Sequence, residues 1–286
     1  MPSPERYHSR RLPKPSQEGG AVPRQPDVLT RLEQAVGQIQ DSETFRAYLD
    51  VQARFHRYSW SNVALILAQK PDSTMVAGYN AWLRMHRYVR RGEKAIKIIV
   101  PMIKKVETED GQEERKLFFS TGNVFDISAT DGEPLPEIAV PVLEGEHGQE
   151  LYQQLERLAQ AEGLQVQTQT ELTGEKMGYY DRSARQVVLR QAAPLQMTKT
   201  LAHELAHHFG GHEKSDPETE TIAESCAYVV CSHFGLDTGE RSFPYVAVWA
   251  QEPAVLRGVL TTVQQVSAKI IDGIEGPKAE DQPELA

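Results

Sequence analysis

The chain of 286 residues is long enough for one large domain or two modest ones. A hydrophobic fraction of 40% and a charged fraction of 25% are ordinary for a globular protein. No apolar run approaches the roughly 18 residues that span a bilayer, which argues against a membrane protein. The net charge of −9 is unevenly spread, at +3 for residues 1–25, +6 for 26–105 and −18 for 106–286. This split predicts two modules with different partners.

The first 25 residues are rich in Pro, Ser, Arg and Gly, and we expect a disordered basic leader. They lack the apolar core of a secretory signal, which predicts a cytoplasmic protein. The two cysteines, Cys226 and Cys231, lie five residues apart on different sides of a predicted helix. We therefore expect reduced, buried thiols and no disulfide.

The first module is predicted over residues 26–130, followed by a linker over 131–148 that is rich in Pro, Gly and Glu. Apolar periodicity predicts helices over residues 27–55, 60–70 and 79–88. Two β-rich runs, 95–102 and 117–127, are joined by a charged hairpin loop at 107–115.

The second module is predicted over residues 149–273, before a disordered acidic tail at 274–286. A helix over 150–162 precedes strands at 164–170, 177–180 and 185–190, and the last of these is expected to offer an edge to an extended peptide. Helices follow at 194–211, 218–234 and 253–271. The whole chain is thus predicted to be an α+β protein of two domains.

The helix at 194–211 carries the sequence His203-Glu204-Leu205-Ala206-His207. Positions four apart share a helical face, so His203 and His207 can bind one zinc ion. Glu204 lies beside them, where it can act as the general base on an activated water. The motif therefore predicts a Zn²⁺-dependent metallopeptidase that acts on a protein or peptide.

A catalytic zinc site needs a third protein ligand. Glu220 and Glu224 share a face of the next helix, and we expect Glu224 as the ligand, with Glu220 orienting a histidine behind it. The alternative, a third histidine after Gly210, is rejected because position 213 is Glu213. Tyr179 and Tyr180 are both candidates for a donor to the oxyanion, and alternation turns only one of them inward.

Basic residues and aromatic rings are concentrated in the first module. Between Trp82 and Lys105 there are eight Lys and Arg against the single acid Glu93. Basic groups contact phosphates and flat rings stack on unpaired bases, so this pattern suits single-stranded nucleic acid. A solvated basic face around a small aromatic core is the alternative.

Several segments resemble the antirestriction proteins of the ArdC type. The N-terminal likeness rests on Tyr58-Ser-Trp-Ser-Asn62, Val76-Ala-Gly-Tyr-Asn-Ala-Trp82, Val89-Arg-Arg-Gly-Glu-Lys94 and Asn123-Val-Phe-Asp126. The C-terminal likeness rests on Gly178-Tyr-Tyr-Asp181, the His203–His207 motif and Glu220-Thr-Ile-Ala-Glu224, and this half is also similar to ImmA/IrrE-type peptidases.

The resemblance implies a small α+β domain that binds single-stranded DNA, followed by a zincin-like metallopeptidase domain of the gluzincin type, with Glu224 as third ligand. It also implies a link to mobile elements and to protecting incoming DNA from restriction. The expected DNA-binding residues are Trp60, Asn62, Tyr79, Trp82, Arg84, Arg90, Arg91, Lys94 and Lys97.

Two alternatives stay open. One is a DNA-coating antirestriction protein that holds a structural metal and cleaves nothing. The other is a DNA-dependent protease that removes DNA–protein crosslinks or cuts a repressor.

Overall fold

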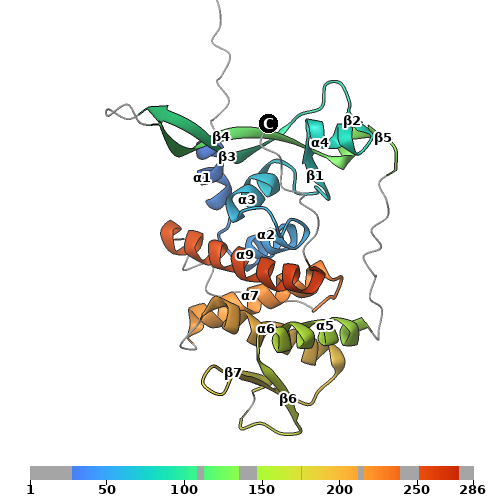
Figure 1. The fold of residues 1–286 in the computed structure, drawn as a ribbon, viewed down its shortest axis with the longest axis vertical. Helices are drawn as coiled ribbons and strands as arrows, with labels where there is room; N and C mark the ends of the chain where they lie inside the picture. The colour runs from blue at the N-terminus through green and yellow to red at the C-terminus, as the bar shows by residue number, and fades with distance from the viewer. Residues whose placement is uncertain are drawn as a thin grey trace, which may run out of the picture.

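The structure is a computed structural model that describes residues 28–107, 113–134, 147–174, 176–211, 216–238 and 251–276. The predicted leader, the middle of the predicted linker and most of the predicted tail lie outside these residues. Figure 1 shows a stack along the long axis: a sheet at one end, layers of helices in the middle and a small sheet at the other end. The mixed α+β class expected from the sequence is confirmed.

The N-terminal half places three helices beneath an antiparallel sheet. The helices are α1 (Val28–Val36), α2 (Ser42–Arg54) and α3 (Trp60–Gln69). The sheet has the order β1-β4-β3, from β1 (Val76–Gly78), β3 (Ile96–Glu107) and β4 (Glu113–Asp126). A short helix α4 (Tyr79–Arg84) leads to β2 (Arg87–Val89), which pairs with β5 (Thr130–Gly132) after the 3₁₀ turn η1 (Ile127–Ala129).

Three sequence predictions in this half are wrong in their boundaries. The single helix expected over 27–55 is two helices, because Asp41 begins α2 with a capping box in which its side chain accepts from Thr44 N–H. The helix expected over 79–88 ends at Arg84, and Tyr88 lies in β2. Residues 131 and 132, expected to open the linker, belong to β5.

The C-terminal half stacks helices over a small sheet of order β6-β8-β7. Its helices are α5 (His147–Ala161), α6 (Pro194–Gly210), α7 (Pro217–His233) and α9 (Pro253–Glu275). Its strands are β6 (Gln165–Gln169), β7 (Gly178–Asp181) and β8 (Gln186–Arg190), with β6 parallel and β7 antiparallel to β8.

Strand β8 is the centre of this sheet, so the prediction that residues 185–190 form a free edge is wrong, and β7 is an edge strand. Helix α9 continues to Glu275, past the start of the predicted tail.

One hydrophobic cluster runs through both halves. It joins Phe45 and Leu49 of α2 to Val229 and Val230 of α7 and to the buried face of α9. Tyr228 of α7 also donates a hydrogen bond to Asp50 Oδ1 at 2.7 Å. Cys226 and Cys231 are both buried free thiols in this core, as expected. Within the described residues, no helix combines the length and apolar character that a bilayer crossing requires.

Candidate metal centre and nucleic-acid interface

Helix α6 holds the His-Glu motif rigidly because its opposite face is core. Leu201, Ala202 and Leu205 have no exposed surface. Pro194 begins the helix and Gly211, at φ 66°, ends it in the left-handed region. His203 and His207 therefore lie one turn apart on a half-buried face, with their Nε2 atoms 3.1 Å from each other.

Helix α7 brings a carboxylate to this pair. Asp216 caps the helix with a capping box, which sets the first turn in place. Glu220 lies in that turn, with Oε2 3.2 Å from His203 Nε2 and Oε1 3.5 Å from His207 Nε2. A carboxylate of α7 and two imidazoles of α6 therefore meet at one point.

The spacing of these donors suits a metal ion. Two ligand atoms about 2.1 Å from one ion at the tetrahedral angle lie about 3.4 Å apart. The measured separations of 3.1, 3.2 and 3.5 Å among His203, His207 and Glu220 bracket that value. The three side chains also form a group whose ligand atoms all lie within 4.8 Å of one another.

Glu224 takes a different place from the one expected. Its Oε2 is 3.4 Å from His203 Nδ1, and its Oε1 is 2.7 Å from Lys199 Nζ. Burial raises the pKa of Glu224, but its bonds to His203 and Lys199 outweigh burial and lower the pKa to about 2. The sequence assigned Glu224 to the ion and Glu220 behind a histidine; the geometry has the two carboxylates in exchanged positions.

This arrangement fixes one ring proton of His203. The ionised Glu224 can only accept, so Nδ1 carries that proton and Nε2 lies toward His207 and Glu220. Burial lowers the pKa of His203, but bonds to Glu220 and Glu224 outweigh burial and raise it to about 9. The cluster thus requires a cation among its donors, either a proton or a metal ion.

Glu204 is only 6% exposed and lies in the same cleft. Burial raises the pKa of its carboxyl, while His203 and His207 and the backbone N–H of Tyr180 act to lower it. A buried carboxylate with a raised pKa is suited to exchanging a proton with a substrate.

The cleft beside these residues has a volume of about 590 Å³. Its walls include the edge strand β7, with Gly178, Tyr179 and Tyr180. Tyr180 OH is 2.9 Å from His208 Nδ1, whereas Tyr179 is 36% exposed. Within the described residues no strand pairs with the outer edge of β7, so an extended chain aligned along this edge would pass the motif histidines.

The expected stacking residues of the N-terminal half divide into buried and exposed ones. Trp82 has no exposed surface and its Nε1–H donates to Phe125 O at 2.9 Å, so the prediction that it stacks on bases is wrong. Asn62 is buried and bonds to the N–H and C=O of Ile99, covering the edge of β3. Trp60 is partly buried against the core. Among the expected rings only Tyr79, at 51%, is well exposed.

The sequence reading missed an exposed apolar surface on the β3–β4 hairpin. Phe119 is 68% exposed, Ile103 63% and Leu117 59%. In the register of the hairpin Phe119 faces Pro101 and Leu117 faces Ile103, so all four share the face turned away from the buried Ile98. The sequence signal for this face was the spacing of Arg115, Leu117 and Phe119, because every second residue of a strand lies on the same face. We call these four residues and the flanking Lys97, Lys105 and Arg115 the hairpin face.

The N-terminal half of the chain matches a known protein family. Residues 26–125 match the family model for the N-terminal domain of anti-restriction factor ArdC. The chain carries an ArdC-type N-terminal domain. The ArdC-type resemblance inferred from the sequence of this half is thereby confirmed.

Solved structures of the antirestriction ArdC protein from the R388 plasmid are also similar to this chain. Its metal-free crystal structure has a TM-score of 0.52 at 20% identity, covering 76% of this chain and 85% of that one. Its Mn(II)-bound crystal structure has a TM-score of 0.54 at 17% identity, covering 87% and 97%. At these identities the likeness establishes a shared fold.

A Bacillus anthracis protein described as uncharacterized is 27% identical over 247 residues, covering 70% of this chain and 42% of the relative. The chain therefore spans about two fifths of the length of that relative.

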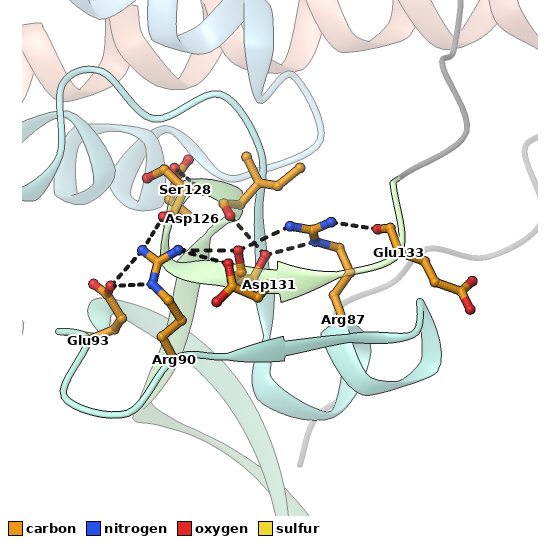
Figure 2. A network of polar contacts seen from close by, with 9 residues as sticks. Arg87, Arg90, Glu93, Asp126, Ser128, Asp131 and Glu133 are labelled. Carbon is orange, nitrogen blue, oxygen red and sulfur yellow. Dashed lines mark hydrogen bonds and ion pairs between the residues drawn. The ribbon is translucent and has the colours of Figure 1, made fainter.

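Two arginines of the ArdC-type domain form ion pairs and hydrogen bonds with other residues of the same half, as Figure 2 shows. Arg90 pairs with Glu93 at 2.7 Å and with Asp131 at 3.3 Å, and also bonds to Ser128 O. Arg87 bonds to Thr130 and to Glu133 O. These contacts attach β5 to β2, so β5 packs with the matched residues although it lies beyond them in the chain.

The remaining expected cations differ from Arg90. Arg84, Arg91 and Lys94 are exposed, and Lys97 bonds to Asn123 Oδ1 across the hairpin. Arg90 is therefore placed to hold the domain together, and the hairpin face with the exposed cations forms the candidate nucleic-acid interface.

Proposed function

We propose that this chain is a divalent-metal-dependent peptidase attached to a domain that binds single-stranded DNA. The observation that carries the first part is the convergence of His203, His207 and Glu220 beside the buried Glu204. Two imidazoles and a carboxylate are the usual ligand set of catalytic zinc in metallopeptidases. The ArdC-type domain supports the second part.

His203, His207 and Glu220 would hold the ion, and we propose Zn²⁺ because imidazole with one carboxylate suits it. The similar ArdC structure with Mn(II) is a further reason to expect a divalent metal. When bound, such an ion supplies Lewis-acid activation of water and of a carbonyl group. Glu224 and Lys199 would keep the His203 ring in its orientation.

The protein's own groups then have separate tasks. Glu204 takes the proton of the attacking water and passes it to the leaving amine. The raised pKa of Glu204 favours the uptake of that proton. Strand β7 aligns an extended peptide along the cleft, because its outer edge is unpaired among the strands that the structure describes and can form backbone hydrogen bonds.

The test is a Glu204→Gln variant assayed with fluorescently labelled casein and by metal analysis. We expect cleavage to be lost while the ion is retained, since glutamine keeps the shape and removes the base. Glu218→Gln, an exposed change in the first turn of α7, is the matched control and should keep both. Cleavage that survives Glu204→Gln would contradict the role of Glu204.

For single-stranded DNA we propose the hairpin face as the contact surface. Phe119 offers a flat ring for a base, while Lys97, Lys105 and Arg115 lie on the same face for phosphates. Figure 1 shows the far end of β3 and β4 projecting past the helices, where a strand has access. Arg84, Arg91 and Lys94 would extend the basic track.

This surface is tested by Phe119→Ala in a titration with a labelled oligo-dT at stated salt. Loss of one stacked base costs about 1–3 kcal/mol, so binding should weaken by about 5-fold to 150-fold. Leu29→Ala, an equally exposed apolar residue on α1, is the control and should leave binding unchanged. Equal affinity of Phe119→Ala and the parent chain would rule the surface out.

The same variants separate the alternative functions. If the protein only coats DNA, Glu204→Gln should keep full protection of incoming DNA while Phe119→Ala loses it. If it is a DNA-dependent protease, casein cleavage should rise when the oligonucleotide is present and the rise should vanish in Phe119→Ala.

A further inference from the structure

A second cluster of histidines and carboxylates lies far from the motif site, where the two halves of the chain meet. His56 follows α2, His233 ends α7, and Asp272 and Glu275 occupy the last turn of α9. Glu220 and His233 are thirteen residues apart on α7, which is about 20 Å along the helix. The two clusters are therefore separate sites.

His56 contributes a buried ring nitrogen. The residue is 8% exposed, and its Nε2 has no hydrogen-bond partner in the described residues. The nearest opposite charge is Asp272 Oδ1 at 3.5 Å. A buried imidazole nitrogen without a hydrogen bond is a candidate metal ligand.

The ring of His233 contacts both α2 and α9 at this cluster. Its Nδ1 lies 2.8 Å from Ala53 O, and because a carbonyl only accepts, this nitrogen carries a proton. Its Nε2 lies 3.0 Å from Glu275 Oε1. His233 is therefore placed to hold the Glu275 carboxylate at the cluster, as residues that support metal ligands do.

Arg57 lies beside the same carboxylates. Its Nη2 is 3.2 Å from Asp272 Oδ1 and 4.0 Å from Glu275 Oε2. The guanidinium therefore competes with any cation for these carboxylates. A metal ion between them and His56 would satisfy the buried ring nitrogen.

We propose that His56, Asp272 and Glu275 bind a second divalent metal ion that clamps the N-terminal half to α9, with His233 holding Glu275. The ligand atoms of the three residues lie within 4.8 Å of one another. The 3.5 Å between His56 Nε2 and Asp272 Oδ1 matches two ligands of one ion. An imidazole with two carboxylates selects the zinc or cobalt class over calcium or magnesium.

The first experiment removes the motif site so that only the second site can bind metal. A His203→Ala/His207→Ala chain is loaded with Co²⁺, dialysed and measured for visible absorption and metal content. We expect one bound ion per chain, and a melting temperature about 5 °C or more above that of the metal-free form. Absence of a bound ion in this background would overturn the proposal.

The second experiment assigns the ion to its ligands in the same background. His56→Gln and Asp272→Asn should each lose the ion, while the exposed Asp72→Asn control should keep it. Arg57→Gln should bind at least about fivefold tighter, because a competing unit charge near the ion is removed. An ion that survives both His56→Gln and Asp272→Asn, or an affinity indifferent to Arg57, would place it elsewhere and refute the proposal. Failure of the motif site to bind metal leaves these outcomes unchanged.

Discussion

Replacing Glu220 and Glu224 separately by glutamine distinguishes the two possible third ligands. The carboxylate of Glu220 lies 3.2 and 3.5 Å from the Nε2 atoms of both histidines, whereas Glu224 meets only the Nδ1 of His203. Glu220→Gln therefore removes a charged ligand, and Glu224→Gln removes support from behind a ligand. Loss of such support typically weakens metal affinity by 10-fold to 100-fold, or about 1.4–2.7 kcal/mol.

We expect Glu224→Gln to fall in that range and Glu220→Gln to exceed 100-fold. The assay is a competition titration of Zn²⁺ between the protein and a chromophoric chelator at pH 7.5, with Glu218→Gln as the exposed control on the same helical turn. Helical content by circular dichroism should be unchanged in all three variants. If Glu224→Gln loses more affinity than Glu220→Gln, the ligand assignment drawn from this geometry is wrong.

Three further predictions concern residues away from the motif. Trp82→Phe should destabilise the chain by about 1–3 kcal/mol, since it leaves the part-buried Phe125 O without its Nε1–H donor. It should not change oligonucleotide affinity, and weaker DNA binding at unchanged melting temperature would contradict its core role. Arg90→Gln should lower the melting temperature by detaching β5 from β2, and a loss of DNA affinity alone would instead make it a phosphate contact. His56 has a folded pKa near 4, below its unfolded value of about 6.5, so the metal-free chain should lose stability as pH falls from 6.5 through 4. Denaturation midpoints measured across this pH range should fall less steeply in His56→Gln than in the parent chain.

The motif helix was predictable because its chemistry is local. The spacing of His203 and His207 on one helix already puts both rings on one face, whatever surrounds them. Pro194 and Gly211 likewise mark the helix ends through their own backbone preferences. The choice between Glu220 and Glu224 was not predictable in this way, because both lie on the same face of α7. Only the rotation of α7 against α6 decides which carboxylate meets the Nε2 atoms of His203 and His207.

The nucleic-acid residues were harder to predict because composition does not report burial. Trp82 and Tyr79 are three residues apart in one short helix, yet the first is in the core and the second is half exposed. Arg90 counts as positive charge in the sequence, but Glu93 and Asp131 neutralise it in the fold. Phe119 was overlooked because a strand phenylalanine is more often buried, and its exposure depends on how far the hairpin extends beyond the helices.

By itself, the amino-acid sequence determined the ArdC-type likeness, the α+β class and the His-Glu motif, since each depends on residue order within a short segment. Only the tertiary structure decided that Glu220 faces the histidine pair, that Trp82 is core, and that His56 meets Asp272 and Glu275 across 215 or more positions of chain. Contacts of that kind arise from the packing of whole helices, and helix packing depends on the summed shape of buried side chains along both halves of the chain.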